Sequence, residues 1–445
     1  MSWSRLKPVR LSMVVVCLTL AGIMLQLAVG QETVTGSGDN SELFLPLVTK
    51  LIKPKNSRVS VASNGTQANG DSYGTDISAE GRYITFVSEA SNLVSNDTNG
   101  QADVFLHDRQ TGQTSRVSVA SDGMQANGFS GRARISADGR YIAFSSNAPN
   151  LVSNDNNYRL DVFVHDQQTG QTSRVSVASD GTEGDNSSMT TAISADGRYI
   201  AFISDATNLV SGDDVVFDVF VHDRQTGQTS LVSVASDGTK GNQPSYSADI
   251  SADGRYVAFD SLATNLVNDD TNNRDDVFVH DQQTGQTSRV SVAPDGTEFN
   301  DSSYFPSISA DGRYVEFTTH HVWVHDRQTG QTSQVSVAWN DVGSFSQLLN
   351  SSISTNGRFV TIRANDDNPL LGDTNDYYDI FIFDRQTGQT NLISMAWDGR
   401  QSNGDSHGSS LTGDGRYVAF SSRASNLVLG DTNGYQDVFV RDLGQ

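Results

Sequence analysis

The sequence predicts an all-β protein in which one structural unit is repeated seven times, and two observations support this prediction. First, a Gly-Arg pair recurs at intervals of 57 or 58 residues, with one interval of 45. Second, no segment of the repeats has apolar residues at the helical period of 3.6. Such self-similarity is typical of repeat architectures. The seven pairs begin at Gly81, Gly139, Gly197, Gly254, Gly312, Gly357 and Gly415.

Each unit contains four strand signals in the same order, here called a to d. In the second unit, strand a ends at Ile135, and a tight turn leads into strand b at Tyr141–Phe144. Gly139 in that turn supplies a positive φ angle. A longer loop precedes strand c at Asp161–Asp166, and another turn leads to strand d at Arg174–Ala178. Four strands in about 58 residues favour a propeller blade over a solenoid coil.

The two ends of the repeat region complete one blade. Arg58–Ala62 is a strand d without strands a, b and c before it, and Asp437–Gln445 is a strand c and turn without a strand d. Pairing them closes a ring and removes both open sheet edges. The predicted fold is therefore a seven-bladed β-propeller with four-stranded blades over residues 56–445, closed by the N-terminal strand in the last blade. The length of 445 residues alone would suggest about three domains.

A family resemblance rests on these same residues. Ile135–Phe144, followed by Asp161–Val164, resembles the WD40-like repeat of TolB-type propellers. The resemblance covers all seven units, the fifth being partly degenerate, and it implies the fold. It implies no activity, because propellers serve many unrelated functions. The unit is longer than the usual blade of that family, and the helical N-terminal domain of TolB has no counterpart in this sequence, so no role in the TolB envelope system is carried over.

Residues 1–30 predict a signal peptide. They begin with three basic residues, continue with a 19-residue apolar run and end on a small-residue cleavage motif. The apolar run is just long enough to span a bilayer, so an uncleaved membrane anchor is the alternative. Residues 31–55 are expected to form a linker. We expect an exported protein, whether periplasmic, at the cell surface or secreted, and one without disulfides because Cys17 is the only cysteine.

The composition restricts the range of partners. The chain has 30 Lys and Arg against 52 Asp and Glu, which gives a net charge of −22. This charge repels phosphate backbones and excludes nucleic acid as an expected partner. It favours metal cations or basic partners instead. We expect a monomer, with membrane contact only through an uncleaved N-terminal segment.

Most of the surplus acid recurs in one loop. In a propeller, the b–c and d–a loops emerge on one face and the short turns on the other. The turns are nearly identical between units, so we expect ligands on the loop face. The b–c loop carries Asp-x-Asn-x-x-x-Asp, a spacing of oxygen ligands that suits Ca²⁺. The alternative is that these residues form Asx-turns that cap strand c. The candidate metal ligands are Asp97, Asn99, Asp103, Asp155, Asn157, Asp161, Asp270, Asn272, Asp276, Asp373, Asn375, Asp379, Asp431, Asn433 and Asp437.

Two units depart from this loop pattern. The third unit has an altered version with Asp213, Asp214 and Asp218, and the fifth has lost about thirteen residues and the motif with them. Near that deletion the chain carries its clearest asymmetric candidates for ligand binding, Trp339, Trp397 and His320. A pair of exposed indoles beside a notch in the loop rim would hold a sugar or a peptide. The alternative is that both indoles fill the space left by the deletion.

No catalytic residue is predicted. Two segments, 70–74 and 404–408, match the Gly-x-Ser-x-Gly pattern, but that motif requires a strand-to-helix turn in an α/β sheet. The aligned units also place Ser at the same column, which a repeated structural position explains. Five histidines likewise share one column of strand c, and we expect them to pack or hydrogen-bond between blades: His107, His165, His222, His280 and His325.

The sequence therefore favours a non-catalytic scaffold that binds a protein or a glycan through its loop face, with Ca²⁺ as the expected stabilising ion. Near-identical blades leave few unique residues for an asymmetric active site. The alternative is an extracellular lyase or hydrolase that acts on a carbohydrate or a lactone at a cation-assisted site in the channel mouth.

Overall fold

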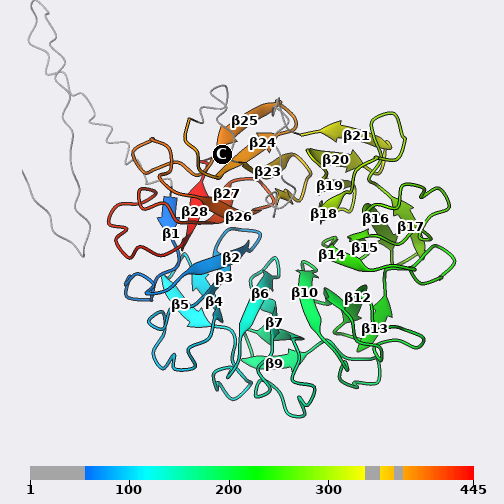
Figure 1. The fold of residues 1–445 in the computed structure, drawn as a ribbon. Coiled ribbons are helices and arrows are strands. Elements are labelled where there is room, and N and C mark those ends of the chain that lie inside the picture. Colours follow the sequence, from blue (N-terminus) through cyan, green and yellow to red (C-terminus); the bar gives the residue numbers. More distant parts are fainter. Residues whose placement is uncertain (1–55, 336–350, 365–373, 445) are drawn as a thin grey trace, which may run out of the picture. The chain divides into compact units, whose positions relative to one another are not determined.

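The computed structural model describes residues 56–335, 351–364 and 374–444, and this part of the chain is all β. It forms seven four-stranded antiparallel sheets arranged as blades around a central axis (Figure 1). The predicted seven-bladed propeller is confirmed. No helix that could cross a membrane is found among the described residues. The predicted signal peptide or anchor (1–30) and linker (31–55), as well as Trp339 and Asp373, lie outside the described residues.

The first four blades each run from strand a at the axis to strand d at the rim. Blade 1 consists of β2 (Ser72–Ile77), β3 (Tyr83–Ser88), β4 (Asp103–Asp108) and β5 (Gln113–Arg116). Blade 2 consists of β6 (Ser130–Ile135), β7 (Tyr141–Ser146), β8 (Asp161–Asp166) and β9 (Gln171–Arg174). Blade 3 consists of β10 (Ser188–Ile193), β11 (Tyr199–Ser204), β12 (Asp218–Asp223) and β13 (Gln228–Leu231). Blade 4 consists of β14 (Ser245–Ile250), β15 (Tyr256–Ser261), β16 (Asp276–Asp281) and β17 (Gln286–Arg289).

The last three blades complete the ring. Blade 5 consists of β18 (Tyr304–Ile308), β19 (Tyr314–Thr318), β20 (Val322–Asp326) and β21 (Gln331–Gln334). Blade 6 consists of β22 (Ser352–Ile353), β23 (Phe359–Ala364), β24 (Asp379–Asp384) and β25 (Gln389–Leu392). Blade 7 consists of β26 (Ser406–Leu411), β27 (Tyr417–Ser422), β28 (Asp437–Asp442) and β1 (Asn56–Arg58).

Strand β1 closes the ring as predicted. It pairs antiparallel with β28, so that Ser57 lies opposite Val440. The buried side chain of Asn56 fixes the strand further, because its Nδ2 donates to the carbonyls of Met395 at 2.6 Å and Leu427 at 3.1 Å. The N-terminal strand is therefore bonded to the last blade by both backbone and side chain.

Strand d begins and ends about four residues earlier than predicted. In blade 1 it covers Gln113–Arg116, whereas the sequence pattern predicted residues 116–120. The Ser118 hydroxyl explains where the ladder ends, since it takes the N–H of Val104 at 3.1 Å in place of a backbone carbonyl. Beyond that point, Val119 makes an isolated bridge with Gln125 in the d–a loop.

The apolar core lies within and between the blades. Phe144 and Phe163 stack on neighbouring strands of blade 2 with ring centroids 5.8 Å apart, and neither ring is exposed. Val162 and Val164 of the same blade pack against Phe202 of blade 3. Similar clusters recur around the ring. Burial of these apolar layers is the main favourable term in the stability of the fold.

The turn face is used for contact between blades. A Cβ on Gly139 would lie 2.2 Å from Cδ2 of Tyr83 in the preceding blade, and the φ of Gly139 is 78°. Only glycine satisfies both conditions. The next residue, Arg140, pairs with Asp166 at 2.8 Å and lies 4.7 Å from the ring centroid of Tyr141. The near-identity of these turns from blade to blade therefore has a structural cause.

The histidine column hydrogen-bonds within its own blade, and a threonine carries the contact on to the blade before it. In blade 1, Nδ1 of His107 is 2.9 Å from the Thr114 hydroxyl, which donates to the carbonyl of Val61 in the blade before it. Burial lowers the pKa of His107 to about 4, so the ring is neutral near pH 7. The same pairing with strand d recurs at His165, His222, His280 and His325.

Candidate functional site

The asparagines of the repeated b–c loops form Asx-turns. Oδ1 of Asn99 accepts the N–H of Gln101 at 2.9 Å, and its Nδ2 donates to Oδ2 of Asp103 at 3.2 Å. The amide nitrogen, which cannot bind a cation, therefore faces the carboxylate. This capping alternative is confirmed for the Asn side chains of all five loops, because the same two bonds recur at Asn157, Asn272, Asn375 and Asn433.

In blade 1 the loop carboxylates already face a cation that the chain itself supplies. Nη1 of Arg116, at the end of β5, lies 3.3 Å from Asp97 and 3.2 Å from Asp103. All three side chains are nearly buried. Gln125, from the d–a loop, donates to Asp97 at 3.0 Å. Blade 7 has the same arrangement, in which Arg58 lies 3.0 Å from Asp431 and 3.1 Å from Asp437.

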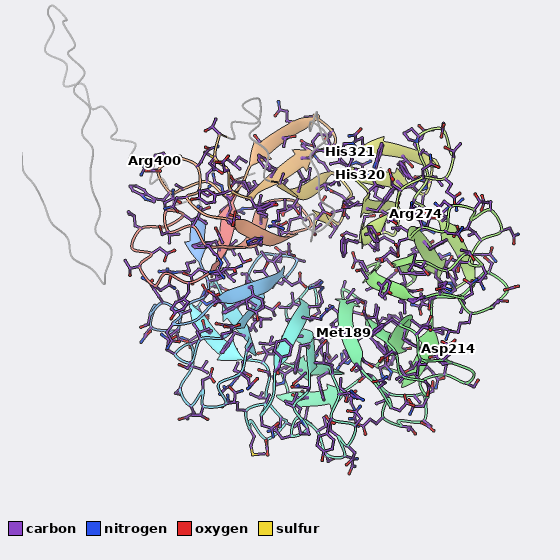
Figure 2. All side chains as sticks on the ribbon, viewed as in Figure 1. Met189, Asp214, Arg274, His320, His321 and Arg400 are labelled. Carbon is purple, nitrogen blue, oxygen red and sulfur yellow. The ribbon has the colours of Figure 1, made fainter. Side chains whose placement is uncertain are left out.

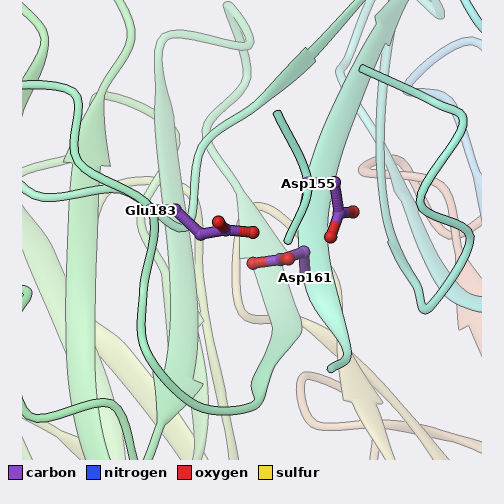
Figure 3. Close-up of side chains that lie close together, drawn as sticks. All are labelled: Asp155, Asp161 and Glu183. Atoms are coloured by element: carbon purple, nitrogen blue, oxygen red, sulfur yellow. The ribbon is translucent and has the colours of Figure 1, made fainter. Parts of the chain in front are cut away.

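Blade 2 differs because a third carboxylate joins the loop. Glu183, from the d–a loop after β9, stands where blade 1 has Gln125. Its carboxylate converges with those of Asp155 and Asp161 (Figure 3), and ligand oxygens of all three lie within 4.8 Å of one another. The sequence analysis had identified the two aspartates but not this glutamate.

The third carboxylate changes the ion pairing in blade 2. Nη1 of Arg174 lies 2.5 Å from Glu183, 3.5 Å from Asp161 and 3.9 Å from Asp155. The Asp155 side chain is only 1% exposed, and neither of its oxygens accepts a hydrogen bond from a described residue. Burial raises the pKa of Asp155, and it raises the pKa of Asp161 to about 6. A single arginine therefore does not neutralise the three carboxylates, and the cluster keeps a net negative charge.

Blade 4 repeats the arrangement of blade 2. Nη1 of Arg289 lies 2.5 Å from Glu298 and 3.6 Å from Asp276. Asp270 completes the group, with its ligand oxygens within the same 4.8 Å span and without a hydrogen-bond donor among the described residues. Burial raises the pKa of Asp276 to about 7.

Blades 3 and 6 have no arginine at the end of strand d, where Leu231 and Leu392 stand. In blade 3, Nζ of Lys240 takes its place and lies 2.5 Å from Asp213, 2.5 Å from Asp214 and 2.9 Å from Asp218. Figure 2 shows Asp214 on the outer part of this blade. In blade 6, Asp379 accepts hydrogen bonds from Asn375 at 3.1 Å and from Ser402 at 2.8 Å.

The blades also differ near the start of strand a, the strand nearest the ring axis. Figure 2 shows one residue of this position, Met189, near the centre of the ring. Around the ring this position changes from aromatic to aliphatic to glycine, whereas the turn face stays almost constant. The residues that follow the aligned serine at the start of strand a are Tyr73, Gly131, Met189, Tyr246, Tyr304 and His407; in blade 5 this serine, Ser303, precedes β18.

Two buried acids lie beside the tyrosines of blades 4 and 5. Asp260, in β15, is 2% exposed, and Asp275, just before β16, is 8% exposed. The Tyr304 hydroxyl donates to Asp275. Oδ1 of Asp260 has no hydrogen-bond partner in the described part of the chain. Burial, together with the charge of Asp275, raises the pKa of Asp260 to about 8.

Strand b of blades 5 and 6 contributes two more unusual side chains. Glu316 is fully buried and accepts a hydrogen bond from Ser351 at 2.6 Å, and burial raises the pKa of Glu316 to about 8. The guanidinium of Arg363 lies 4.0 Å from the ring centroid of Tyr378. The sequence does not predict these residues as a site, because each charge occurs only once at its position in the repeat.

The predicted ligand-binding residues are placed only in part. Trp397 is 50% exposed, in the loop after β25. His320 lies 3.5 Å from Asp301, and Figure 2 shows His320 and His321 in blade 5. Because Trp339 is not among the described residues, the predicted indole pair stays a prediction.

The fold resembles that of several solved structures. An oligogalacturonate lyase, solved in complex with manganese, matches with a TM-score of 0.52 and 13% identity over 88% of this chain and 93% of the lyase. TolB from Acinetobacter baumannii matches with a TM-score of 0.40 and 15% identity over 82% of each chain. A putative TolB from Agrobacterium tumefaciens matches with a TM-score of 0.38 and 14% identity over 84% of this chain and 91% of that one.

The shared feature is the propeller fold. No family model matches the sequence, and no curated protein matches it significantly. At 13% identity, the match to the lyase describes architecture alone.

Proposed function

We propose that this chain is an exported, non-catalytic propeller that binds a protein or glycan ligand at the loop-face end of its channel. One observation carries the proposal: side chains vary between blades at this end, while the turn face is constant. Tyr246 and Tyr304 stand there beside Asp260 and Asp275. Variation confined to one surface of a repeated scaffold is typical of ligand recognition.

The chemistry of this surface favours a neutral or basic ligand. Tyrosine rings offer flat apolar faces with a polar hydroxyl at the edge, which suit sugar rings and side chains alike. Carboxylates accept hydrogen bonds from ligand hydroxyl and amino groups. The net charge of −22 repels acidic partners.

Export is the second part of the proposal, and it rests on the sequence of residues 1–30. Their basic start, apolar run and small-residue motif are those of a secretory signal. Because residues 31–445 contain no cysteine, the exported chain would fold without disulfides.

A binding screen tests the proposal with a double tyrosine variant and a control variant in which a different tyrosine is replaced. Neutral and amino-containing oligosaccharides, and basic peptides, are titrated into the full chain. Tyr246→Ala with Tyr304→Ala is expected to weaken binding by tenfold or more. The control is Tyr435→Ala, which removes a 44% exposed tyrosine in the b–c loop of blade 7 and is expected to leave affinity unchanged. Equal affinity in all variants would place the ligand elsewhere and overturn the proposed site.

A second candidate function, a lyase or hydrolase acting on a carbohydrate or lactone, is favoured by one observation. Burial raises the pKa of Asp260 and that of Glu316 to about 8, a range useful for proton transfer near neutral pH. Turnover of a bound oligosaccharide or lactone distinguishes the two functions. Asp260→Asn would abolish turnover and retain binding in an enzyme, whereas a scaffold gives no product in either form.

A further inference from the structure

The loops of blades 1 and 7 differ from those of blades 2 and 4 at one residue of the d–a loop that lies beside the b–c loop. Gln125 in blade 1 and Gln67 in blade 7 occupy the position that Glu183 fills in blade 2 and Glu298 fills in blade 4. The strand-d arginine and the two loop aspartates are the same in all four blades. We call the loops of blades 1 and 7 glutamine-type loops and those of blades 2 and 4 glutamate-type loops. Comparing the two types shows what the third carboxylate changes.

The glutamate takes the arginine away from the first aspartate of the loop. In blade 1, Nη1 of Arg116 lies 3.3 Å from Asp97, whereas in blade 2 Nη1 of Arg174 lies 3.9 Å from Asp155. Both oxygens of Asp155 are then buried without a hydrogen-bond donor, and the same is true of Asp270 in blade 4. A buried carboxylate without a partner is costly and is normally paired or bound to a metal.

The net charges of the two loop types indicate which kind of ligand the glutamate-type loop would bind. A glutamine-type loop has two carboxylates and one guanidinium, a net charge of −1, and Gln125 donates a hydrogen bond to Asp97. The glutamate-type loop of blade 2 has three carboxylates and one guanidinium, a net charge of −2. Blade 4 has the same set, and its Arg289 also lies 3.4 Å from the exposed Asp269. One divalent cation would neutralise this set.

The geometry of the three carboxylates suits Ca²⁺. Their ligand oxygens lie within 4.8 Å of one another. Two oxygens on opposite sides of a Ca²⁺ ion are about 4.6–5.2 Å apart, because each bond is about 2.3–2.6 Å long. Hard oxygen ligands from carboxylates are those that this ion prefers.

We propose that this propeller binds two divalent cations such as Ca²⁺, one between Asp155, Asp161 and Glu183 and one between Asp270, Asp276 and Glu298. Arg174 and Arg289 remain on the glutamates and orient them toward the ion. Blades 1 and 7 bind none, because Arg116 and Arg58 already neutralise their acid pairs. Lys240 has the same effect in blade 3. Of the five loops predicted from the sequence, the proposal assigns ions to two and excludes blades 1 and 7; blade 6 is not assigned, because its Asp373 lies outside the described residues. The proposal adds a glutamate to each site and is independent of the ligand at the channel mouth.

Calorimetric titration of Ca²⁺ into the chelator-treated full chain tests this proposal. The two glutamate-type loops are expected to bind two ions. Glu183→Gln and Glu298→Gln, which copy the residue found in blades 1 and 7, each remove one ion, and the double variant removes both. The reverse change, Gln125→Glu, is expected to create a third site in blade 1. Circular dichroism confirms that each variant is folded.

Three results would overturn the proposal. A stoichiometry of five would assign the ions to the Asp-x-Asn motif itself, and a stoichiometry of zero would leave the acids neutralised by protons. Unchanged stoichiometry in both glutamine variants would exclude Glu183 and Glu298 as ligands. Gln125→Glu is expected to add a binding site, so its result can be interpreted even if the other variants lose stability.

Discussion

Nη1 of Arg174 lies 2.5 Å from the carboxylate of Glu183, and this ion pair separates two kinds of loop in an otherwise uniform ring. Where the partner residue is Gln125, the corresponding arginine stays with the loop aspartates at 3.2 and 3.3 Å. A single exchange of Gln for Glu therefore changes the electrostatic balance of a blade without changing its strands.

The buried arginine of blade 1 is expected to be essential for the stability of that loop. Arg116→Leu leaves Asp97 and Asp103 without a cation, and breaking a buried ion pair in this way costs about 3–5 kcal/mol. The free energy of unfolding, measured by denaturant titration, checks this. Arg116→Lys keeps the charge and is expected to lose less.

Blade 3 supplies a rescue for this variant. It has Leu231 at the arginine position and Lys240 in the d–a loop, so adding Gln125→Lys to Arg116→Leu copies a natural combination. The double variant is expected to recover most of the lost stability. If Arg116→Leu is as stable as the parent protein, the guanidinium does not compensate the two carboxylates.

The contact between Gly139 and Tyr83 is expected to limit substitution in the a–b turn. Gly139→Ala places a Cβ 2.2 Å from the Tyr83 ring at a φ of 78°. The control, Gly170→Ala, has a φ of 72° but open space around the new Cβ. The backbone strain alone costs about 1–2 kcal/mol in both variants, and overpacking adds about 1–3 kcal/mol to Gly139→Ala. Equal melting temperatures for the two variants would contradict an inter-blade role for this glycine.

Stability is expected to be greatest at mildly acid pH in the absence of metal. Arg140 holds the pKa of Asp166 well below its usual range, so the stability from this pair is present above the unfolded pKa of about 3.9 and is lost as the pH falls below it. Burial raises the pKa of Asp161 to about 6 and that of Asp276 to about 7. These two groups favour folding when protonated; that contribution is fully present below the unfolded pKa of about 3.9 and is lost as the pH rises from there through 6 to 7.

Thermal unfolding in chelator across this pH range checks the prediction, with a maximum expected at about pH 4. Glu183→Gln with Glu298→Gln removes one charge from each cluster and is expected to make the decline between about pH 4 and 7 shallower. A melting temperature that rises steadily from pH 5 to pH 8 would show that the buried carboxylates do not titrate in this way.

The side chain of Asn56 is expected to hold the ring closed. Asn56→Ala removes the donor to the Met395 and Leu427 carbonyls and is expected to cost about 1–3 kcal/mol. Hydrogen exchange should then become faster in β1 and β28 while it stays slow in blade 2. Ser57→Ala, whose hydroxyl makes only a long 3.4 Å bond, is the matched control. Equal acceleration in every blade would mean that the loss is not local to the closure.

The fold was predictable because the information is repeated. A weak strand signal such as Tyr141–Phe144 becomes decisive when it recurs in seven units, and the incomplete ends showed how the ring closes. The position of strand d was predicted less well, because the side chain of Ser118 takes a backbone donor and ends the ladder early. The pattern of strand residues in the sequence does not show where a side-chain hydroxyl replaces a backbone carbonyl as the acceptor.

The candidate sites were predictable only where they repeat. Asp155 and Asp161 belong to a visible motif, but Glu183 comes from a different loop and reaches them only after β9 and β10 are placed. Asp260 was not predicted because it does not repeat: the same position of strand b holds Ser145 in blade 2 and no charged residue in blade 1. A comparison that searches aligned units for unique residues would have found it.

The closure of the ring by β1 and β28 also sets an order of assembly. Each of blades 1 to 5 takes its four strands from one continuous stretch of chain, so each forms as soon as that stretch is available. Blade 7 takes its strands from opposite ends of the repeat region. In a chain that emerges N-terminus first, β1 stays an unpaired strand edge until residues 437–442 follow, and unpaired edges promote aggregation. The three residues Asn56–Arg58 are thus the first part of the propeller to be made and the last to be protected.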